Sequence, residues 1–171
     1  ALEVAMAVEN GADEVDIVLN VGRMLTGEYD EAANEVEVIR TEMDEDVVLK
    51  VIIESGALKT PELIRRASLL SMFAGADFVK TSTGKIDVAA TPEAAVVMCV
   101  AIRDYFDKTG RKVGFKAAGG VRTAQDAALY YTIVEEILGK EWLTTDLFRI
   151  GASSAANNLL TAIEGKEVKY F

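Results

Sequence analysis

The sequence contains no histidine, which removes the commonest general base and the commonest metal ligand from the available chemistry. A Ser-His or Cys-His nucleophile pair and a His-ligated zinc site are therefore excluded within these 171 residues. The single cysteine, Cys99, lies in a run with a helical pattern, and we expect it to be a buried thiol. No disulfide framework points to an oxidising compartment, and the chemistry that remains is that of lysine and carboxylates.

Long apolar runs and an excess of basic residues are missing as well. The sequence shows neither a signal peptide nor an apolar stretch long enough to cross a membrane, which predicts a cytoplasmic protein without a membrane partner. The net charge of -10 argues against a nucleic-acid partner. An anionic substrate would therefore have to be held by local cations. The cations near the candidate loops are Lys80, Lys85, Lys116, Arg122 and Arg149.

Short apolar runs alternate with helical patterns along the whole chain. Half of the residues are hydrophobic, which is enough to bury a core. The threonines before Pro61 and Pro92 are typical helix N-caps, and segment 123–126 resembles a capping box. The alternation predicts a parallel sheet covered by helices. We expect strands at 14–19, 47–53, 77–82, 112–117 and 147–151, and helices at 1–10, 28–43, 61–74, 92–108, 124–138 and 154–163.

Five predicted strands are too few for a complete TIM (β/α)8 barrel, which takes roughly 250 residues. The chain also opens inside a helical pattern, with no start signal before residue 1. We therefore expect residues 1–171 to form a single domain that holds the last five βα units of such a barrel, with about three N-terminal units missing. The alternative is a complete five-stranded doubly wound sheet. Against it, no glycine-rich phosphate loop follows the first strand, and the candidate chemistry is spread over several strand ends.

Two lysines stand where an apolar run breaks into a turn of small residues. Lys80 lies in FVKTSTG (78–84), and Lys116 lies one strand–helix unit further on, in GFKAAGGVR (114–122). A lysine with the ordinary pKa of about 10.4 is protonated at neutral pH, but burial and a neighbouring cation both lower a lysine pKa. We predict that Lys80 is a nucleophile that forms an imine and that Lys116 supplies the cation. The alternative for Lys80 is an ordinary surface lysine at a strand end.

A carboxylate interrupts the first predicted strand. The segment GADEVD (11–16) matches GADFVK (75–80), and in this register Asp16 corresponds to Lys80. This correspondence places both side chains on the same face of the sheet, so we predict that Asp16 is a proton-shuttle carboxylate. A structural aspartate paired with a lysine is the alternative, and it does not exclude the shuttle role. Lys50 and Glu54 share one strand parity and are candidates to extend this polar layer, or to form a structural ion pair.

Glycine-rich turns precede the last two predicted helices. Glycine lets the backbone approach an anion, and the following helix N-terminus directs N–H groups toward it. TIM barrels often bind phosphate with the loops after their last two strands. The alternative is ordinary turn and N-cap chemistry. The predicted phosphate site comprises Gly119, Gly120, Val121, Arg122, Gly151, Ser153 and Ser154, with Gly84 and Lys85 as further contacts.

These segments resemble deoxyribose-phosphate aldolases, a family of class I aldolases with a TIM-barrel fold. The matching segments are EVDIV (14–18), LKVIIE (49–54), FVKTSTGK (78–85), GFKAAGGVR (114–122) and FRIGASS (148–154). One local departure is Ala117, where the family usually has proline. The resemblance implies that Lys80 forms a Schiff base with acetaldehyde, that Lys116 perturbs Lys80, and that Asp16 relays protons with Lys116 and a water. It also implies that a 5-phosphate binds at the loops of Gly84, Gly120, Ser153 and Ser154.

The resemblance further implies reversible cleavage of 2-deoxy-D-ribose 5-phosphate to acetaldehyde and D-glyceraldehyde 3-phosphate, with no metal and no organic cofactor. One alternative is another Schiff-base aldolase or a transaldolase-like barrel with a different donor. The other is a non-catalytic barrel that binds phosphorylated metabolites, in which the lysines only hold an anion. The sequence leaves open whether the protein forms homo-oligomers and what the tail ending in Tyr170 and Phe171 does.

Overall fold

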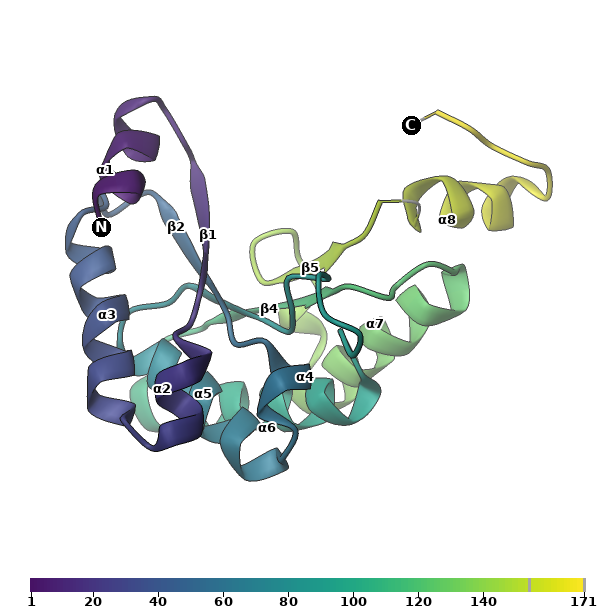
Figure 1. Ribbon diagram of the computed structural model, residues 1–171. Helices are drawn as coiled ribbons and strands as arrows, with labels where there is room; N and C mark the ends of the chain where they lie inside the picture. Colours follow the sequence, from purple (N-terminus) through teal and green to yellow (C-terminus); the bar gives the residue numbers. More distant parts are fainter. Residues whose placement is uncertain (154, 171) are drawn as a thin grey trace.

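Five parallel strands pair in the order in which they occur along the chain. The computed structural model describes residues 1–153 and 155–170. Each strand is hydrogen-bonded to the next, and the sheet curves as it runs from the first to the fifth (Figure 1). The strands are β1 (Glu14–Val18), β2 (Val48–Ile52), β3 (Phe78–Lys80), β4 (Gly114–Ala118) and β5 (Phe148–Gly151). All five predicted strands are confirmed, and each predicted end lies within two residues of the observed one.

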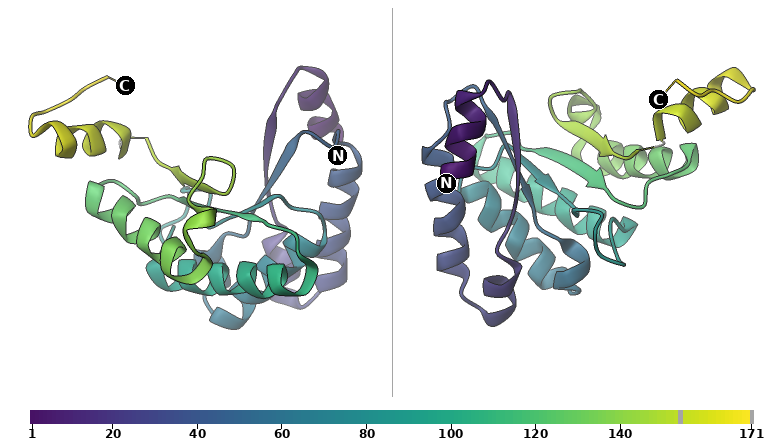
Figure 2. Two further views of the ribbon diagram at one scale, coloured as in Figure 1. Left: turned by 180° about the vertical axis from the view of Figure 1, so that it is seen from behind. Right: turned by 45° about the horizontal axis from the view of Figure 1, so that its top comes forward.

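Helices cover the outer side of this curved sheet. The four longest each lie between two consecutive strands: α3 (Tyr29–Thr41), α5 (Pro61–Phe73), α6 (Pro92–Thr109) and α7 (Ala124–Leu138). Figures 1 and 2 show these helices on one side of the sheet, whereas no described helix covers the inner side. The remaining helical elements are α1 (Leu2–Glu9), α2 (Val21–Thr26), α4 (Ser55–Leu58), the 3-10 helix η1 (Lys140–Trp142) and α8 (Ala155–Glu164).

The predicted helix starts are confirmed. The hydroxyl oxygens of Thr60 and Thr91 accept hydrogen bonds from Leu63 N and Ala94 N, and a proline occupies the first helical turn in each case. Segment 123–126 forms a reciprocal capping box at the start of α7. The short elements α2, α4 and η1 were not predicted, because three to six residues are too few to display a helical period.

The strands present hydrophobic side chains to the outer, helix-covered face of the sheet, and their ionisable side chains lie on the inner face. Leu49, Val51 and Ile53 are fully buried against the helices. Between them, Lys50 points to the inner side of the sheet, because successive side chains of a strand face opposite ways. As predicted, Cys99 is a free thiol in the core, and its burial raises the pKa of that thiol.

The sequential order of five parallel strands, with helices on the outer side only, is the arrangement of part of a (β/α)8 barrel. A doubly wound sheet would reverse its strand order at a switch point and carry helices on both faces. That alternative is therefore wrong. The absence of three further N-terminal units stays a prediction. Among the described helices, none is long and apolar enough to cross a membrane.

Candidate active site

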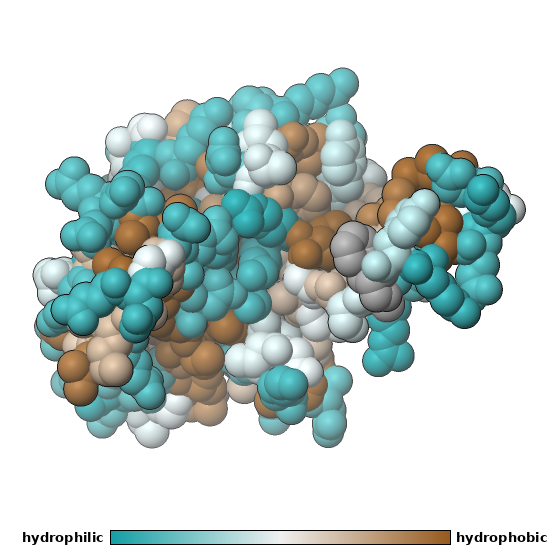
Figure 3. Space-filling view, turned by 90° about the horizontal axis from the view of Figure 1, so that it is seen from above, coloured by the Kyte–Doolittle hydropathy of each residue, from teal (hydrophilic) through white to brown (hydrophobic). Residues whose placement is uncertain are grey.

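Ionisable side chains gather on the inner face of the sheet. Lys80 lies opposite Lys116, Lys116 lies opposite Arg149, and Asp16 lies opposite Lys50 in the register of neighbouring strands. Seen from above, hydrophilic residues occupy the middle of this face (Figure 3). With Glu14, these residues make a group of four cations and two carboxylates that are linked by ion pairs. This face is therefore locally positive in a chain whose net charge is strongly negative.

Asp16 is the common partner of three amines. Its Oδ2 atom accepts hydrogen bonds from Lys80 Nζ at 2.7 Å and from Lys116 Nζ at 2.9 Å. Its other oxygen, Oδ1, lies 3.2 Å from Lys50 Nζ. The structure therefore brings together the three residues for which the sequence predicts catalytic roles, and it adds Lys50 to them.

The pKa of Asp16 reflects a competition between burial and these amines. Burial by itself would raise the pKa of the carboxyl group, because it disfavours the charged form. The hydrogen bonds from Lys80 and Lys116, together with their positive charges, outweigh burial and lower the pKa to about 2. Asp16 is consequently ionised at neutral pH and acts as an acceptor and counter-ion for both lysines.

A second carboxylate holds the far end of this charged group. Glu14 accepts a hydrogen bond from Lys50 at 2.5 Å and another from Arg149 at 2.9 Å. The bond from Lys50, whose side chain is only 2% exposed, is the main cause of the lowered pKa of Glu14. Sequence reasoning did not single out Glu14. Its position two residues before Asp16 was the available signal, because residues i and i+2 of a strand share a face.

Glu54 does not join this group, although it shares strand parity with Lys50. The backbone of Glu54 is left-handed, with φ of 54°, and so the alternation of strand β2 ends before it. Its side chain is buried and turns toward the loop 81–91 between β3 and α6, which we call the β3–α6 loop. Glu54 Oε2 accepts from Thr83 Oγ1 at 2.6 Å, and Oε1 accepts from Thr83 N at 3.2 Å. Glu54 therefore anchors the start of this loop.

A cavity of about 430 Å³ lies beside the two lysines, between the loops that follow β3, β4 and β5. We call it the inner cavity. Every residue of the predicted phosphate site that the structure describes lines it, whereas Ser154 lies outside the described residues. Its lining comprises Lys80, Thr83, Gly84, Lys85, Lys116, Ala118, Gly119, Gly120, Val121, Arg122, Gly151, Ala152 and Ser153.

Two consecutive glycines shape the backbone at this cavity. Gly119 and Gly120 have φ of 84° and 81°, a conformation that glycine adopts at little cost. Within the described part of the chain, the N–H groups of Gly120 and Val121 have no hydrogen-bond partner. They are therefore suited to bind an anion at the inner cavity.

Other backbone donors near the cavity are already used. Gly84 N donates to Ser82 Oγ at 3.0 Å, and Lys85 N donates to Thr83 Oγ1 at 3.1 Å. Gly84 consequently contributes shape to the cavity, not a free N–H group. The backbone N–H of Arg122 is likewise engaged, by the carboxylate of Asp126 at 3.0 Å.

This arrangement of groups is suited to the attack of a lysine amine on the carbonyl carbon of an anionic compound. Two lysine amines share one carboxylate oxygen at the edge of the inner cavity, and unused backbone donors lie on its wall. Among the described residues, no group of three or more metal-ligating side chains is found.

The chain is similar to known aldolases along most of its length. Residues 1–154 match the model of a family described as DeoC/LacD family aldolase. A deoxyribose-phosphate aldolase of Mus musculus is 50% identical over 157 residues, which are 92% of this chain and 49% of the mouse protein. The Homo sapiens deoxyribose-phosphate aldolase is 46% identical over the same shares of both chains. The chain thus spans about half the length of the curated relatives it matches.

Solved structures agree with this similarity. The tetrameric deoxyribose phosphate aldolase from Aeropyrum pernix superposes with a TM-score of 0.68 at 27% sequence identity. The superposition covers 95% of this chain and 60% of that one. Because the Aeropyrum pernix structure aligns over nearly all of this chain, the curved sheet and its helices are shared with that protein.

The low pKa of Asp16 predicts how stability depends on pH. The ordinary value of 3.8 applies to the unfolded chain and about 2 to the folded chain. The ionised carboxylate therefore stabilises the fold above pH 3.8, and this contribution is lost as the pH falls toward 2. In urea unfolding followed by circular dichroism, the free energy of unfolding should fall over this interval.

Asp16→Asn should remove that part of the pH dependence. It should also lower stability at pH 7, because the buried lysines lose their counter-ion. Asp13→Asn, just before the same strand, serves as the control and should leave the acid dependence in place. An Asp16→Asn protein with the full acid dependence of the parent would contradict the assignment.

The contact between Glu54 and Thr83 predicts an effect on anion binding. Glu54→Ala should weaken the binding of inorganic phosphate about tenfold, because a charge-assisted hydrogen bond that holds the loop is removed. Glu54→Gln, which keeps an acceptor for Thr83, should retain most of the affinity. Calorimetric titration measures both, with Glu62→Ala on the exposed start of α5 as the control. Equal phosphate affinity in Glu54→Ala and the parent protein would rule out this anchoring role.

Proposed function

Since the chain belongs to the DeoC/LacD family of aldolases, we propose that this protein cleaves 2-deoxy-D-ribose 5-phosphate reversibly to acetaldehyde and D-glyceraldehyde 3-phosphate. The main support for the proposal is that Lys80 and Lys116 both donate a hydrogen bond to the same oxygen of Asp16. Beside this pair, the inner cavity offers a positively charged wall and unused backbone donors. We also propose that the chain is part of a single (β/α)8 domain, and that the site residues predicted from the sequence have the roles given to them there.

The phosphate group of the substrate is bound in the inner cavity. The N–H groups of Gly120 and Val121 donate to its oxygens, and Lys85 and Arg122 contribute positive charge from the cavity wall. Binding at this end leaves the carbonyl carbon of the sugar near Lys80. The anion is therefore held by backbone and local cations, despite the acidic character of the whole chain.

In the cleavage direction, the neutral amine of Lys80 attacks the aldehyde carbon C1, and loss of water gives an iminium ion. The hydroxyl on C3 loses its proton, the C2–C3 bond breaks, and D-glyceraldehyde 3-phosphate leaves. The electron pair of that bond forms an enamine between C2 and C1, and the iminium nitrogen is neutralised. Protonation at C2 and hydrolysis then release acetaldehyde and regenerate the amine of Lys80.

Lys116 and Asp16 support these steps, because Asp16 Oδ2 accepts hydrogen bonds from both Lys80 Nζ and Lys116 Nζ. Lys116 places a second positive charge beside the Lys80 amine, at the same oxygen of Asp16, and a neighbouring cation disfavours the protonated form of an amine. Asp16 fixes the position of both amines and, with a water molecule, provides the path by which protons reach or leave C2 and the C3 oxygen. Asp16 is ionised at neutral pH, since its pKa is about 2.

The decisive test is reduction with borohydride in the presence of acetaldehyde, followed by peptide mass mapping. We expect a reduced two-carbon adduct on Lys80, which is absent from Lys80→Arg because guanidinium stays protonated. Lys166→Arg, in the C-terminal segment, is the matched control and should be labelled like the parent. Pyruvate and dihydroxyacetone, offered as alternative donors, should give no comparable adduct.

Other results of this test would change either the roles of the two lysines or the proposed function. An adduct on Lys116 would exchange the roles of the two lysines. Adducts with pyruvate or dihydroxyacetone instead of acetaldehyde would identify a Schiff-base aldolase with another donor. A folded protein that binds phosphate but forms no adduct would be a non-catalytic phosphometabolite-binding barrel.

The role of Lys116 predicts a change in the pH–rate profile. Lys116→Leu should lower the rate of cleavage at neutral pH by at least tenfold and move the rising limb of the profile to higher pH, because the neighbouring cation is lost. Lys116→Arg keeps the charge and should hold the limb near its original pH, although the rate falls with the altered geometry. Steady-state rates between pH 5 and 10 distinguish the two variants. An unshifted profile in Lys116→Leu would refute the electrostatic role.

A further inference from the structure

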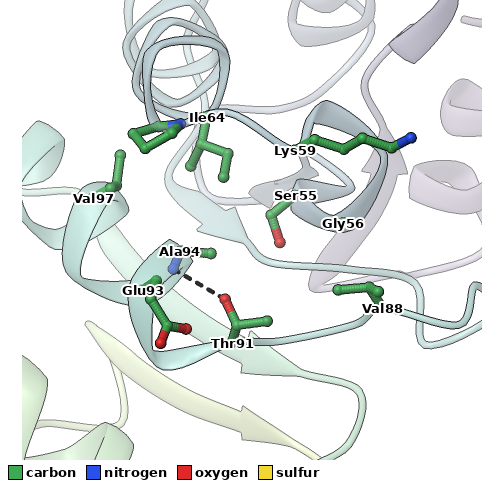
Figure 4. A pocket seen from close by; sticks show the side chains of 10 residues that line it. Ser55, Gly56, Lys59, Ile64, Val88, Thr91, Glu93, Ala94 and Val97 are labelled. Atoms are coloured by element: carbon green, nitrogen blue, oxygen red, sulfur yellow. Dashed lines mark hydrogen bonds between the residues drawn. The ribbon is translucent and has the colours of Figure 1, made fainter.

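A second cavity, of about 380 Å³, lies on the outer side of the sheet, behind the β3–α6 loop (Figure 4). We call it the outer cavity. Its walls come from α4, the start of α5, the end of the β3–α6 loop and the start of α6. They are mainly apolar, and none of the lining residues lines the inner cavity. The lining comprises Ser55, Gly56, Lys59, Pro61, Ile64, Val88, Thr91, Glu93, Ala94 and Val97.

One buried polar atom of this cavity lacks a partner. Ser55 is only 3% exposed, and its hydroxyl is the one buried side-chain polar atom in the described part of the chain without a hydrogen bond. Figure 4 shows this hydroxyl pointing into the space between α4 and the start of α6. A buried hydroxyl without a partner has lost its hydration and gained no hydrogen bond in return, which is unfavourable. Thr91, across the cavity, already accepts a hydrogen bond from Ala94 N at 3.1 Å.

The character of the walls limits the ligand. An ion would lose its hydration against Ile64, Val88 and Val97 without a buried charge to replace it. Lys59 extends its amine away from the cavity (Figure 4), and Glu93 is exposed. A volume of this size suits a small molecule, and a hydroxyl deep among apolar side chains suits one polar atom on that molecule.

We propose that the outer cavity binds a small neutral molecule that has a mainly apolar body and a single carbonyl or hydroxyl oxygen, which is hydrogen-bonded to the hydroxyl of Ser55. The backbone of Ser55 is held in place by a hydrogen bond from its N–H to the carbonyl oxygen of Thr81 at 2.9 Å. The backbone that carries the binding hydroxyl is therefore fixed at the end of the sheet.

The β3–α6 loop is a wall of both cavities. Gly84 and Lys85 line the inner cavity, whereas Val88 and Thr91 line the outer one. On the outer side, a Cβ atom at Gly56 would overlap the carbonyl group of Val88, so the loop packs directly on α4.

On the inner side, the same loop packs on the turn after β4. Ala90 N donates to Gly119 O at 3.2 Å. A Cβ atom at Gly119 would lie only 2.6 Å from Ala89 Cβ and 3.0 Å from Gly84 Cα. A molecule in the outer cavity therefore supports the loop from behind and changes the affinity of the inner cavity for phosphate. This coupling rests on the proposed phosphate site, whereas binding in the outer cavity does not.

Two matched probes test the binding site: benzyl alcohol, which has one hydroxyl and cannot form a Schiff base, and toluene, which lacks that oxygen. In titrations of the protein followed by amide NMR, both should bind saturably and shift resonances of α4 and the first turn of α6. Ser55→Ala should weaken benzyl alcohol binding roughly fivefold and leave toluene binding unchanged, because one hydrogen bond is lost.

A pair of substitutions on one helix provides the control. Val97→Trp should fill the outer cavity and abolish the binding of both probes, whereas Val96→Trp, on the exposed face of α6, should leave binding intact. Circular dichroism confirms that the variants fold. The absence of saturable binding to the folded parent protein would overturn the site. An equal loss of toluene and benzyl alcohol affinity in Ser55→Ala would overturn the role of its hydroxyl.

The coupling is tested by titrating inorganic phosphate with and without saturating benzyl alcohol. We expect at least a twofold change in the phosphate dissociation constant, an equal change in benzyl alcohol affinity when phosphate is saturating, and no change in Val97→Trp. Unchanged phosphate affinity in the parent would overturn the coupling while leaving the binding site in place. The acetaldehyde adduct on Lys80 is measured separately, so failure of the coupling is distinguished from failure of the proposed aldolase activity.

Discussion

The contact of Asp16 with Lys80 and Lys116 is the interaction on which the inner face of the sheet depends. One carboxylate oxygen accepts from both amines, and Lys50 approaches the other oxygen. Without Asp16, three buried or half-buried amines would face one another with only Glu14 nearby, and their repulsion would oppose the parallel packing of β1 to β4. The same contact keeps two amines beside the inner cavity, so the structural requirement and the proposed chemistry are met by one group.

The β3–α6 loop connects this charged face with the rest of the fold. Glu54 anchors its start through Thr83, and Gly56 and Gly119 allow its end to pack closely against α4 and the turn after β4. The loop is thus positioned by contacts with the start of α4 and with the turn after β4, instead of by its own secondary structure. Because it borders both the inner and the outer cavity, its position determines the shape of each.

Patterns that repeat along the chain were read correctly from the sequence. The strands, the six longer helices and the capped starts of α5, α6 and α7 were predicted because period, proline position and N-cap chemistry are local signals. The short helices α2 and α4 and the left-handed Glu54 were missed. Four to six residues carry no period, and the side chain of the left-handed Glu54 accepts hydrogen bonds from Thr83, a contact between distant residues that no local pattern displays.

The sequence alone narrowed the candidate chemistry to lysine and carboxylate groups: it lacks histidine and places two lysines and an aspartate within or at the end of apolar strands. It also determined the parallel sheet, since alternating strands and helices pack in that way. Only the tertiary structure decided that Lys50 and Glu14 join these residues, that Glu54 turns away to Thr83, and that Ser55 faces an outer cavity. Strand curvature and backbone conformation set these contacts between distant residues, and a linear pattern of residue types does not specify either.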